Sequence, residues 1–211
     1  MTFPESSGRG SPRVKPDTIR LRSGEQGMKG LAMRPAGVVL DDAERLQWDF
    51  MPFVSVGPLR FGMSHDEVVA ALGVEYASLL VPGRSAEFHL PNSGGQALTT
   101  YYADAGRLHG VAIDALHGPQ VTMGELRLVG RVPSKLADQF RDYVLSQGLR
   151  NNVYFSQEGD PGADELGLQL RAQRAGDILL SRPVFVARAW AERVGDTSEG
   201  HIPQEEWQVH A

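Results

Sequence analysis

The feature that most constrains the fold of this chain is a pattern of elements that occurs twice, about 70 residues apart. Each copy has a helix-forming segment, short strand-forming runs and a hairpin turn that contains glycine, Gly106 in the first copy and Gly176 in the second. The Leu-Arg-Phe run that begins at Leu59 is also echoed by Leu-Arg-Leu from Leu126. Self-similarity at a fixed period is typical of a repeated structural unit, so we expect an internal duplication.

The first helix is predicted by its start and stop signals. Ser64 followed by Glu67 has the form of a capping box, in which the side chain of each residue accepts a hydrogen bond from the backbone N–H of the other. Val68 and Leu72 recur at helical spacing and predict a buried face. Gly73 is placed to end the helix, because glycine adopts the left-handed conformation at low cost.

The second helix is predicted in the segment KLADQFRDYVLSQ. Leu136, Phe140 and Val144 are spaced by four residues and would share one apolar face. We expect Ser134 to cap its start and Gly148 to end it, as Ser64 and Gly73 do for the first helix.

A further short helix is predicted near residue 41. Asp41 and Glu44 have the Asp-x-x-Glu form of a capping box, and the run ERLQW could continue the helix.

Alternating or β-rich runs predict the strands, at residues 86–90, 98–103, 107–116, 153–156 and 166–173, with a last strand around ILLSRPVFVARAW. Leu168 and Leu170 would face the core, so Gln169 and Arg171 would point to the opposite face. Pro183 lies in the last strand and predicts that this strand is an edge or is bulged.

The fold class that these elements favour is α+β, with two tandem helix-plus-antiparallel-hairpin units that share or abut one sheet. Helices would cover one face and leave the other open. The expected segments are a disordered or loosely attached stretch at 1–37, a first unit at 38–124, a second at 125–194 and an acidic tail at 195–211. We expect the tail to pack back onto the body through Trp207.

Composition excludes several classes of function. The chain has no cysteine, which excludes disulfides, thiolate metal sites and a cysteine nucleophile. Its net charge is −5, but residues 1–37 carry seven basic and three acidic side chains, so the remainder is at −9. A strongly acidic body repels nucleic acid and attracts a basic partner. No apolar run is long enough to span a membrane, and the expected location is the cytoplasm.

Motifs of catalysis and metal binding were sought in the sequence. It has no GxxxxGK[ST] loop, no HExxH and no GxSxG. His109 and His117 are too far apart along a strand to share a metal, and Asp160, Asp164 and Glu165 lack the spacing of a calcium loop. We therefore expect no cofactor, no metal and no catalytic residue.

One stretch resembles a known family. LRFGMSHDEVVAALG, residues 59–73, is similar to the Gly-Met-Thr helix element of the secreted β-lactamase inhibitor proteins of actinomycetes. Those proteins have two tandem units with helices on a sheet, and the small outer-membrane assembly lipoproteins carry one such unit. The second unit of this chain matches in layout only. Small acidic proteins of this type also look like bacterial immunity proteins, and the resemblance implies a scaffold that binds another protein.

The function expected from these features is a non-enzymatic protein-binding module of the inhibitor or immunity type, which occludes a partner with its open sheet face. The partner would be a protein such as a toxin or an enzyme with a basic surface. Interface anchors are often aromatic or arginine residues, and the expected contacts are Tyr101, Tyr102, Gln169 and Arg171. The alternatives are an accessory structural subunit of a larger bacterial complex and an enzyme of unrecognised class.

Overall fold

The structure is a computed structural model that describes residues 38–74, 78–81, 84–103, 105–149, 153–156, 158–196, 201–202 and 206, with the backbone alone at 78–81. All of these residues belong to one compact unit, Met33–Ala211. The predicted loose segment 1–37 and Trp207 lie outside the described residues.

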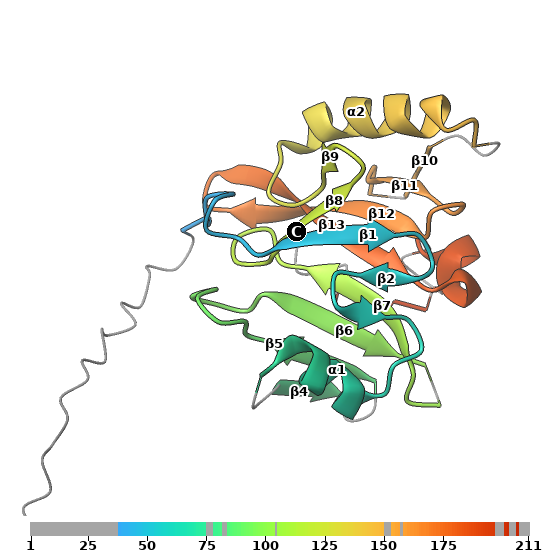
Figure 1. Cartoon of the computed structure of the whole chain (residues 1–211). Helices are drawn as coiled ribbons and strands as arrows, with labels where there is room; N and C mark the ends of the chain where they lie inside the picture. The colour runs from blue at the N-terminus through green and yellow to red at the C-terminus, as the bar shows by residue number, and fades with distance from the viewer. Residues whose placement is uncertain are drawn as a thin grey trace, which may run out of the picture. The chain divides into compact units, whose positions relative to one another are not determined.

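The fold is of the α+β class, as predicted, and most of its regular structure is strand (Figure 1). Within the described residues it has two sheets, where the sequence predicted one sheet or two that abut. The five-stranded sheet has the order β3 (Leu59–Arg60), β2 (Ser55–Val56), β1 (Gln47–Met51), β8 (Gln120–Met123), β9 (Leu126–Arg127). The eight-stranded sheet has the order β10 (Tyr154–Phe155), β11 (Pro161–Ala163), β12 (Leu168–Ala175), β13 (Ile178–Val186), β7 (Leu108–Ile113), β6 (Leu98–Tyr102), β5 (Ser85–Phe88), β4 (Ser78–Val81).

The eight-stranded sheet has a mirrored strand order. Outward from its centre, one half reads β7, β6, β5, β4 and the other reads β13, β12, β11, β10. The halves meet where β7 and β13 pair antiparallel, with Val184 opposite Ala112 and Val186 opposite Gly110. The two predicted hairpins, β6–β7 and β12–β13, are confirmed on either side of Gly106 and Gly176.

Helix α1 (His65–Leu72) confirms the predicted capping box. The Glu67 amide donates to Ser64 Oγ, the Ser64 amide donates to Glu67 Oε2, and Gly73 ends the helix with a φ of 63°. The ring of His65, the first residue of α1, is half-buried, and its Nδ1 lies 3.1 Å from the hydroxyl of Tyr102.

Helix α2 (Pro133–Ser146) begins two residues earlier than predicted. Its N-cap is Val132, which makes no side-chain cap, so the prediction that Ser134 caps the helix was wrong. Pro133 explains the shift: its ring fixes φ at a helical value, and its missing N–H costs nothing in the first turn. Gly148 follows the end of the helix with a φ of 65°, as expected.

The predicted helix near residue 41 does not form. The Asp41 amide donates to Glu44 Oε2 at 3.2 Å, as a capping box would require, but only a turn follows. From Gln47 the chain enters strand β1, which pairs with β2 on one side and with β8, in parallel, on the other. Pairing with two strands outweighs the local helix signal.

The main core lies on one face of the eight-stranded sheet. Trp48 and Phe50 from the five-stranded sheet pack there, and the rings of Phe50 and Phe185 are 4.5 Å apart between centroids. Buried side chains of both helices join the same core, namely Val68, Leu136, Phe140 and Val144. The helices therefore lie on the same side of the sheet.

Strand β13 is central in its sheet and pairs with β12 in continuous register through Pro183, so the prediction that Pro183 marks an edge strand or a bulge was wrong. The ladder explains why the proline is tolerated. The pairing of β13 with β7 begins at Val184, one residue beyond Pro183, so that ladder does not require the missing N–H.

Candidate functional site

Strand register determines which polar side chains share the face of the eight-stranded sheet that lies opposite the main core. Leu168 and Leu170 belong to the core, so Gln169 and Arg171 project to the other face, as predicted. Arg171 lies opposite Arg182 in the ladder, which places both on that face. We call the surface formed by Thr99, Tyr101, Gln169, Arg171 and Arg182 the polar face.

The four predicted contact residues do not lie together. Tyr101 is on the polar face with Gln169 and Arg171, whereas Tyr102 faces the main core. There the Thr100 hydroxyl donates to the Tyr102 hydroxyl at 3.1 Å. Neighbouring residues on a strand point to opposite faces, so Tyr101 and Tyr102 could not both contact the same partner surface.

The polar face is not open, which corrects the sequence-based expectation. Tyr101 is 4% exposed, Gln169 0% and Arg171 2%, and Tyr102 on the core face is also buried. The covering groups come from the C-terminal part of the chain: the 3₁₀ helix η1 (Arg188–Arg193) with Trp190, followed by Val194, Ile202 and Glu206. The tail thus packs onto the body at Ile202 and Glu206, whereas Trp207, the residue expected to anchor it, lies outside the described residues.

Glu206 is the most constrained of these covering residues. Arg182 donates to it twice, from Nε to Oε1 at 2.6 Å and from Nη2 to Oε2 at 3.1 Å. The Tyr101 hydroxyl donates to Oε2 of the same carboxylate. Arg182 Nη1 also lies 3.7 Å from Asp114 Oδ2, so one buried guanidinium serves two carboxylates.

Ile202 provides a second anchor close to Glu206. A Cβ built on Gly110 would lie 3.3 Å from Ile202 Cδ1 and 3.3 Å from Tyr101, so glycine leaves the room in which the isoleucine packs. Tyr101, Gly110 and Arg182 together hold one aliphatic and one carboxylate side chain. We call these three residues the carboxylate seat.

Electrostatics maintain the charges of the carboxylate seat. Burial opposes the charged guanidinium of Arg182, but the nearby Glu206 carboxylate outweighs it and raises the pKa of Arg182. Burial, reinforced by the charge of Glu206, raises the pKa of the Tyr101 hydroxyl well above its ordinary value, so it remains a donor. Burial also acts on Asp114, but hydrogen bonds from His117 and the charge of Arg182 lower its pKa.

A second polar cluster extends the polar face toward β11. Arg171 Nε lies 3.0 Å from Asp160 Oδ2, and Gln169 Nε2 donates to the Asp160 carbonyl at 2.6 Å. The Tyr154 hydroxyl donates to Gln169 Oε1 at 2.8 Å. Gly162 leaves room for this contact, because a Cβ there would come within 2.3 Å of Gln169 Oε1.

Among the described residues, no group of three or more histidine or acidic side chains is placed to hold a metal ion. His109 instead lies against Trp190, with 5.2 Å between ring centroids, and His117 lies 3.4 Å from Asp114. Within the part of the chain that the structure describes, neither helix is long and apolar enough to cross a membrane.

Arg182, Ile202 and Glu206 were missed by the sequence analysis. The position of Arg182 could have been predicted from the sequence, because the hairpin turn at Gly176–Asp177 places it opposite Arg171. The position of Glu206 could not, because this residue lies 24 positions from its partner Arg182 and outside the described strands.

Comparison with known proteins gives no relative for this chain: no protein-family model, no curated protein and no solved structure matches it.

Proposed function

We propose that this protein is a non-enzymatic protein-binding module of the inhibitor or immunity type, and that its carboxylate seat receives a short acidic segment of its partner. The observation that carries the proposal is that the seat already holds such a segment, the chain's own Ile202 and Glu206. An aliphatic residue followed four positions later by a carboxylate is thus the recognition pattern that a partner would reproduce.

The energetics of the seat favour exchange of one carboxylate for another. Leaving Arg182 without its bidentate partner would cost about 3–5 kcal/mol, because a buried charge would lose its compensation. A partner that brings its own carboxylate restores both hydrogen bonds and the Tyr101 contact, so that cost does not arise. The seat therefore selects for an acidic side chain in the incoming segment.

The rest of the interface would be formed by the polar face once the C-terminal residues have left it. Tyr101, Gln169 and Arg171 then become contacts, while Tyr102 remains in the core. A standard interface covers roughly 800 Å² on each partner. The acidic character of the body favours a partner whose surface around the acidic anchor is basic.

The same proposal includes an origin by duplication of the units 38–124 and 125–194. Three observations support it: the mirrored strand order, the helix that precedes each set of four strands, and the packing of both helices on one face. The polar face would then be composed of hairpins from both units.

A peptide-binding measurement on the full-length protein tests the proposal. The probe is a fluorescein-labelled peptide with the sequence of residues 200–207, GHIPQEEW, followed by fluorescence anisotropy. The double variant I202A/E206Q weakens the chain's own hold on the seat, by removing the aliphatic anchor and the negative charge, and is expected to bind the peptide at least tenfold more tightly than the wild type. A peptide with alanine at the position of Glu206 is expected to lose that gain.

The control variant is E192Q, which neutralises an exposed acid of η1 and should bind the peptide as the wild type does. Equal binding by all variants, or binding that ignores the alanine replacement, would contradict the proposal. If circular dichroism shows the double variant to be unfolded, I202A alone gives the same comparison, because it weakens the aliphatic anchor and retains Glu206.

A further inference from the structure

A groove beside helix α2 lies outside the polar face and plays no part in the function proposed above. It has a volume of about 420 Å³ and is open to solvent, and its lining residues are Glu125, Leu126, Arg127, Arg131, Gln139 and Tyr143. We call it the arginine groove. Its volume falls in the range of roughly 300–1,000 Å³ in which small-molecule sites are found.

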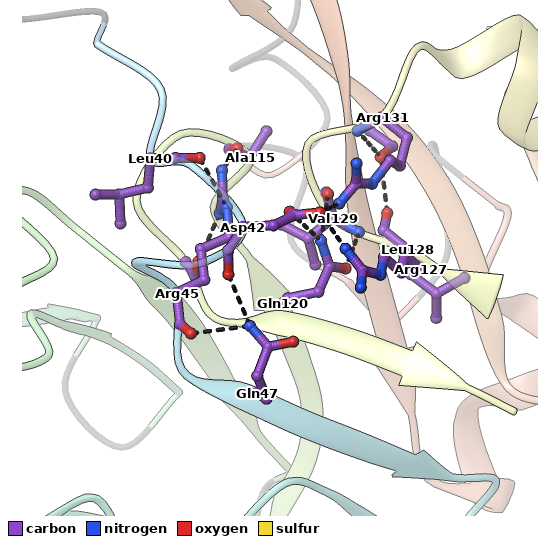
Figure 2. Close-up of polar contacts among 12 residues, drawn as sticks. Leu40, Asp42, Arg45, Gln47, Ala115, Gln120, Arg127, Leu128, Val129 and Arg131 are labelled. Carbon is purple, nitrogen blue, oxygen red and sulfur yellow. Dashed lines mark hydrogen bonds and ion pairs between the residues drawn. The ribbon is translucent and has the colours of Figure 1, made fainter. Parts of the chain in front are cut away.

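Two guanidinium groups of the arginine groove converge on one carboxylate (Figure 2). Arg127 Nη1 donates to Asp42 Oδ2 at 2.6 Å, and Arg131 Nη2 donates to the same oxygen. The other oxygen of Asp42 accepts from Gln120 Nε2 at 3.0 Å. Asp42 thus fixes the position of both arginines but compensates only one of their two charges.

A third guanidinium adds to the positive field around Asp42. The N–H groups of Arg45 donate to the backbone carbonyls of Leu40, Ala115, Leu116 and Gly118. Carbonyl oxygens bear no net charge, so the positive charge of Arg45 is not cancelled by them. Asp42 and Asp114 are the nearby carboxylates whose negative charges stabilise the buried Arg45 guanidinium.

Arg131 also carries a donor that the described part of the chain does not satisfy. Its Nε is buried and has no hydrogen-bond partner among the described residues. Buried donors are normally paired, and an orphaned one favours a ligand or water oxygen beside it. Tyr143 and Gln139 complete the wall with an aromatic ring and an amide, both on α2.

We infer that the arginine groove binds a small-molecule oxyanion, with Arg127 and Arg131 as the guanidinium groups that contact it and Tyr143 as the wall against which the rest of the ligand packs. Guanidinium groups bind carboxylates and phosphates through paired N–H donors. Phosphate esters and polycarboxylates share this chemistry, and the experiment separates them.

Isothermal titration calorimetry of the full-length protein at low salt provides the test, with inorganic phosphate, pyrophosphate and citrate as probes. Saturable 1:1 binding of at least one probe is expected, and sodium chloride should weaken it because the contacts are ionic. Stronger binding of pyrophosphate identifies a phosphate site, and stronger binding of citrate identifies a polycarboxylate site.

The variant R127A should lower the affinity for the preferred probe at least tenfold, and it should fold, because the Arg127 side chain is 55% exposed. The matched control is R141A, which removes an arginine of α2 that is 57% exposed and paired with Asp138, outside the groove. No saturable binding by the wild type, or an equal loss in R127A and R141A, would overturn the inference. Neither result bears on the function proposed for the carboxylate seat, which is tested separately by peptide binding.

Discussion

Glu206 and Arg182 form a bidentate ion pair in which the carboxylate side chain is 2% exposed and the guanidinium side chain is 3% exposed. The two residues are 24 positions apart in the chain. Because the Tyr101 hydroxyl donates to the same carboxylate, a single residue near the C-terminus connects two strands, β6 and β13. This pair covers the polar face together with the apolar contacts of Trp190, Val194 and Ile202.

Neutralising this carboxylate should destabilise the whole protein. The variant E206Q retains an acceptor for Arg182 but removes the compensating charge, and we expect the free energy of unfolding to fall by about 3 kcal/mol. A domain of ordinary stability survives such a loss. Urea denaturation followed by circular dichroism measures it. The exposed control E192Q should change the free energy by less than about 0.5 kcal/mol, and a similar small change in E206Q would show that the pair does not hold the segment.

Asp42 should make the stability of the protein depend on acid pH. Burial opposes its ionised form, but hydrogen bonds from Arg131, Gln120 and Arg127 outweigh burial and lower its pKa to about 2. A carboxyl whose pKa is lowered on folding contributes stability that is present above the unfolded value and is lost as the pH falls through the folded value.

The expected contribution of Asp42 is roughly 1–2 kcal/mol after allowance for solvent screening. Urea unfolding of the wild type and of D42N should therefore differ by that amount at pH 6. The difference should shrink between about pH 4 and pH 2, as the carboxyl is protonated in the unfolded and then in the folded chain. A difference that is constant with pH would show that D42N acts through packing and not through the charge of Asp42.

The two helix starts provide a matched pair of substitutions. Ser64 caps α1 through its hydroxyl, so S64A should cost about 1 kcal/mol of unfolding free energy. Ser134 is exposed and lies inside α2, where Val132 is the N-cap, so S134A should cost less than about 0.5 kcal/mol. Chemical denaturation of both variants measures the difference. Equal losses would mean that Ser134 stabilises α2 in a way that its position does not explain.

Local patterns in the sequence predicted α1, α2 and the two glycine-turned hairpins, although the same kind of pattern at Asp41 and Glu44 predicted a helix that does not form. The capping box at Ser64, the alternation around Leu168 and the glycine turns each depend on residues within a few positions of one another. The five-stranded sheet could not be predicted in this way. Its strands β2, β3 and β9 have two residues each, too few to show a period, and its central pair joins β1 to β8 in parallel across more than 70 residues.

The candidate site was predicted only in part, for a related physical reason. Strand alternation gave the direction of Gln169 and Arg171 correctly, because that direction is a local property of the backbone. Whether the face they share is open depends on where residues beyond the last strand lie. Ile202 and Glu206 carry no periodic signal, and their places are set by Gly110 and Arg182, which are distant in sequence.

Two glycines beside the polar face, Gly162 and Gly110, differ in how closely an added Cβ would approach its neighbours, so replacing each with alanine should destabilise the protein to a different extent. A Cβ at Gly162 would lie 2.3 Å from Gln169 Oε1 and 2.7 Å from the Tyr154 ring, distances at which atoms must move. A Cβ at Gly110 would meet Ile202 and Tyr101 at 3.3 Å, where small shifts suffice. Overpacking of this kind costs about 1–3 kcal/mol.

We therefore expect G162A to lower the free energy of unfolding by about 2 kcal/mol and G110A by about 1 kcal/mol or less. Thermal and urea unfolding of the two variants measure which of them loses more unfolding free energy. The Tyr154–Gln169 hydrogen bond is what G162A would break, so Y154F should remove part of the additional penalty in the double variant G162A/Y154F. Equal losses at the two glycines, or full additivity with Y154F, would show that Gly162 is not required for this contact.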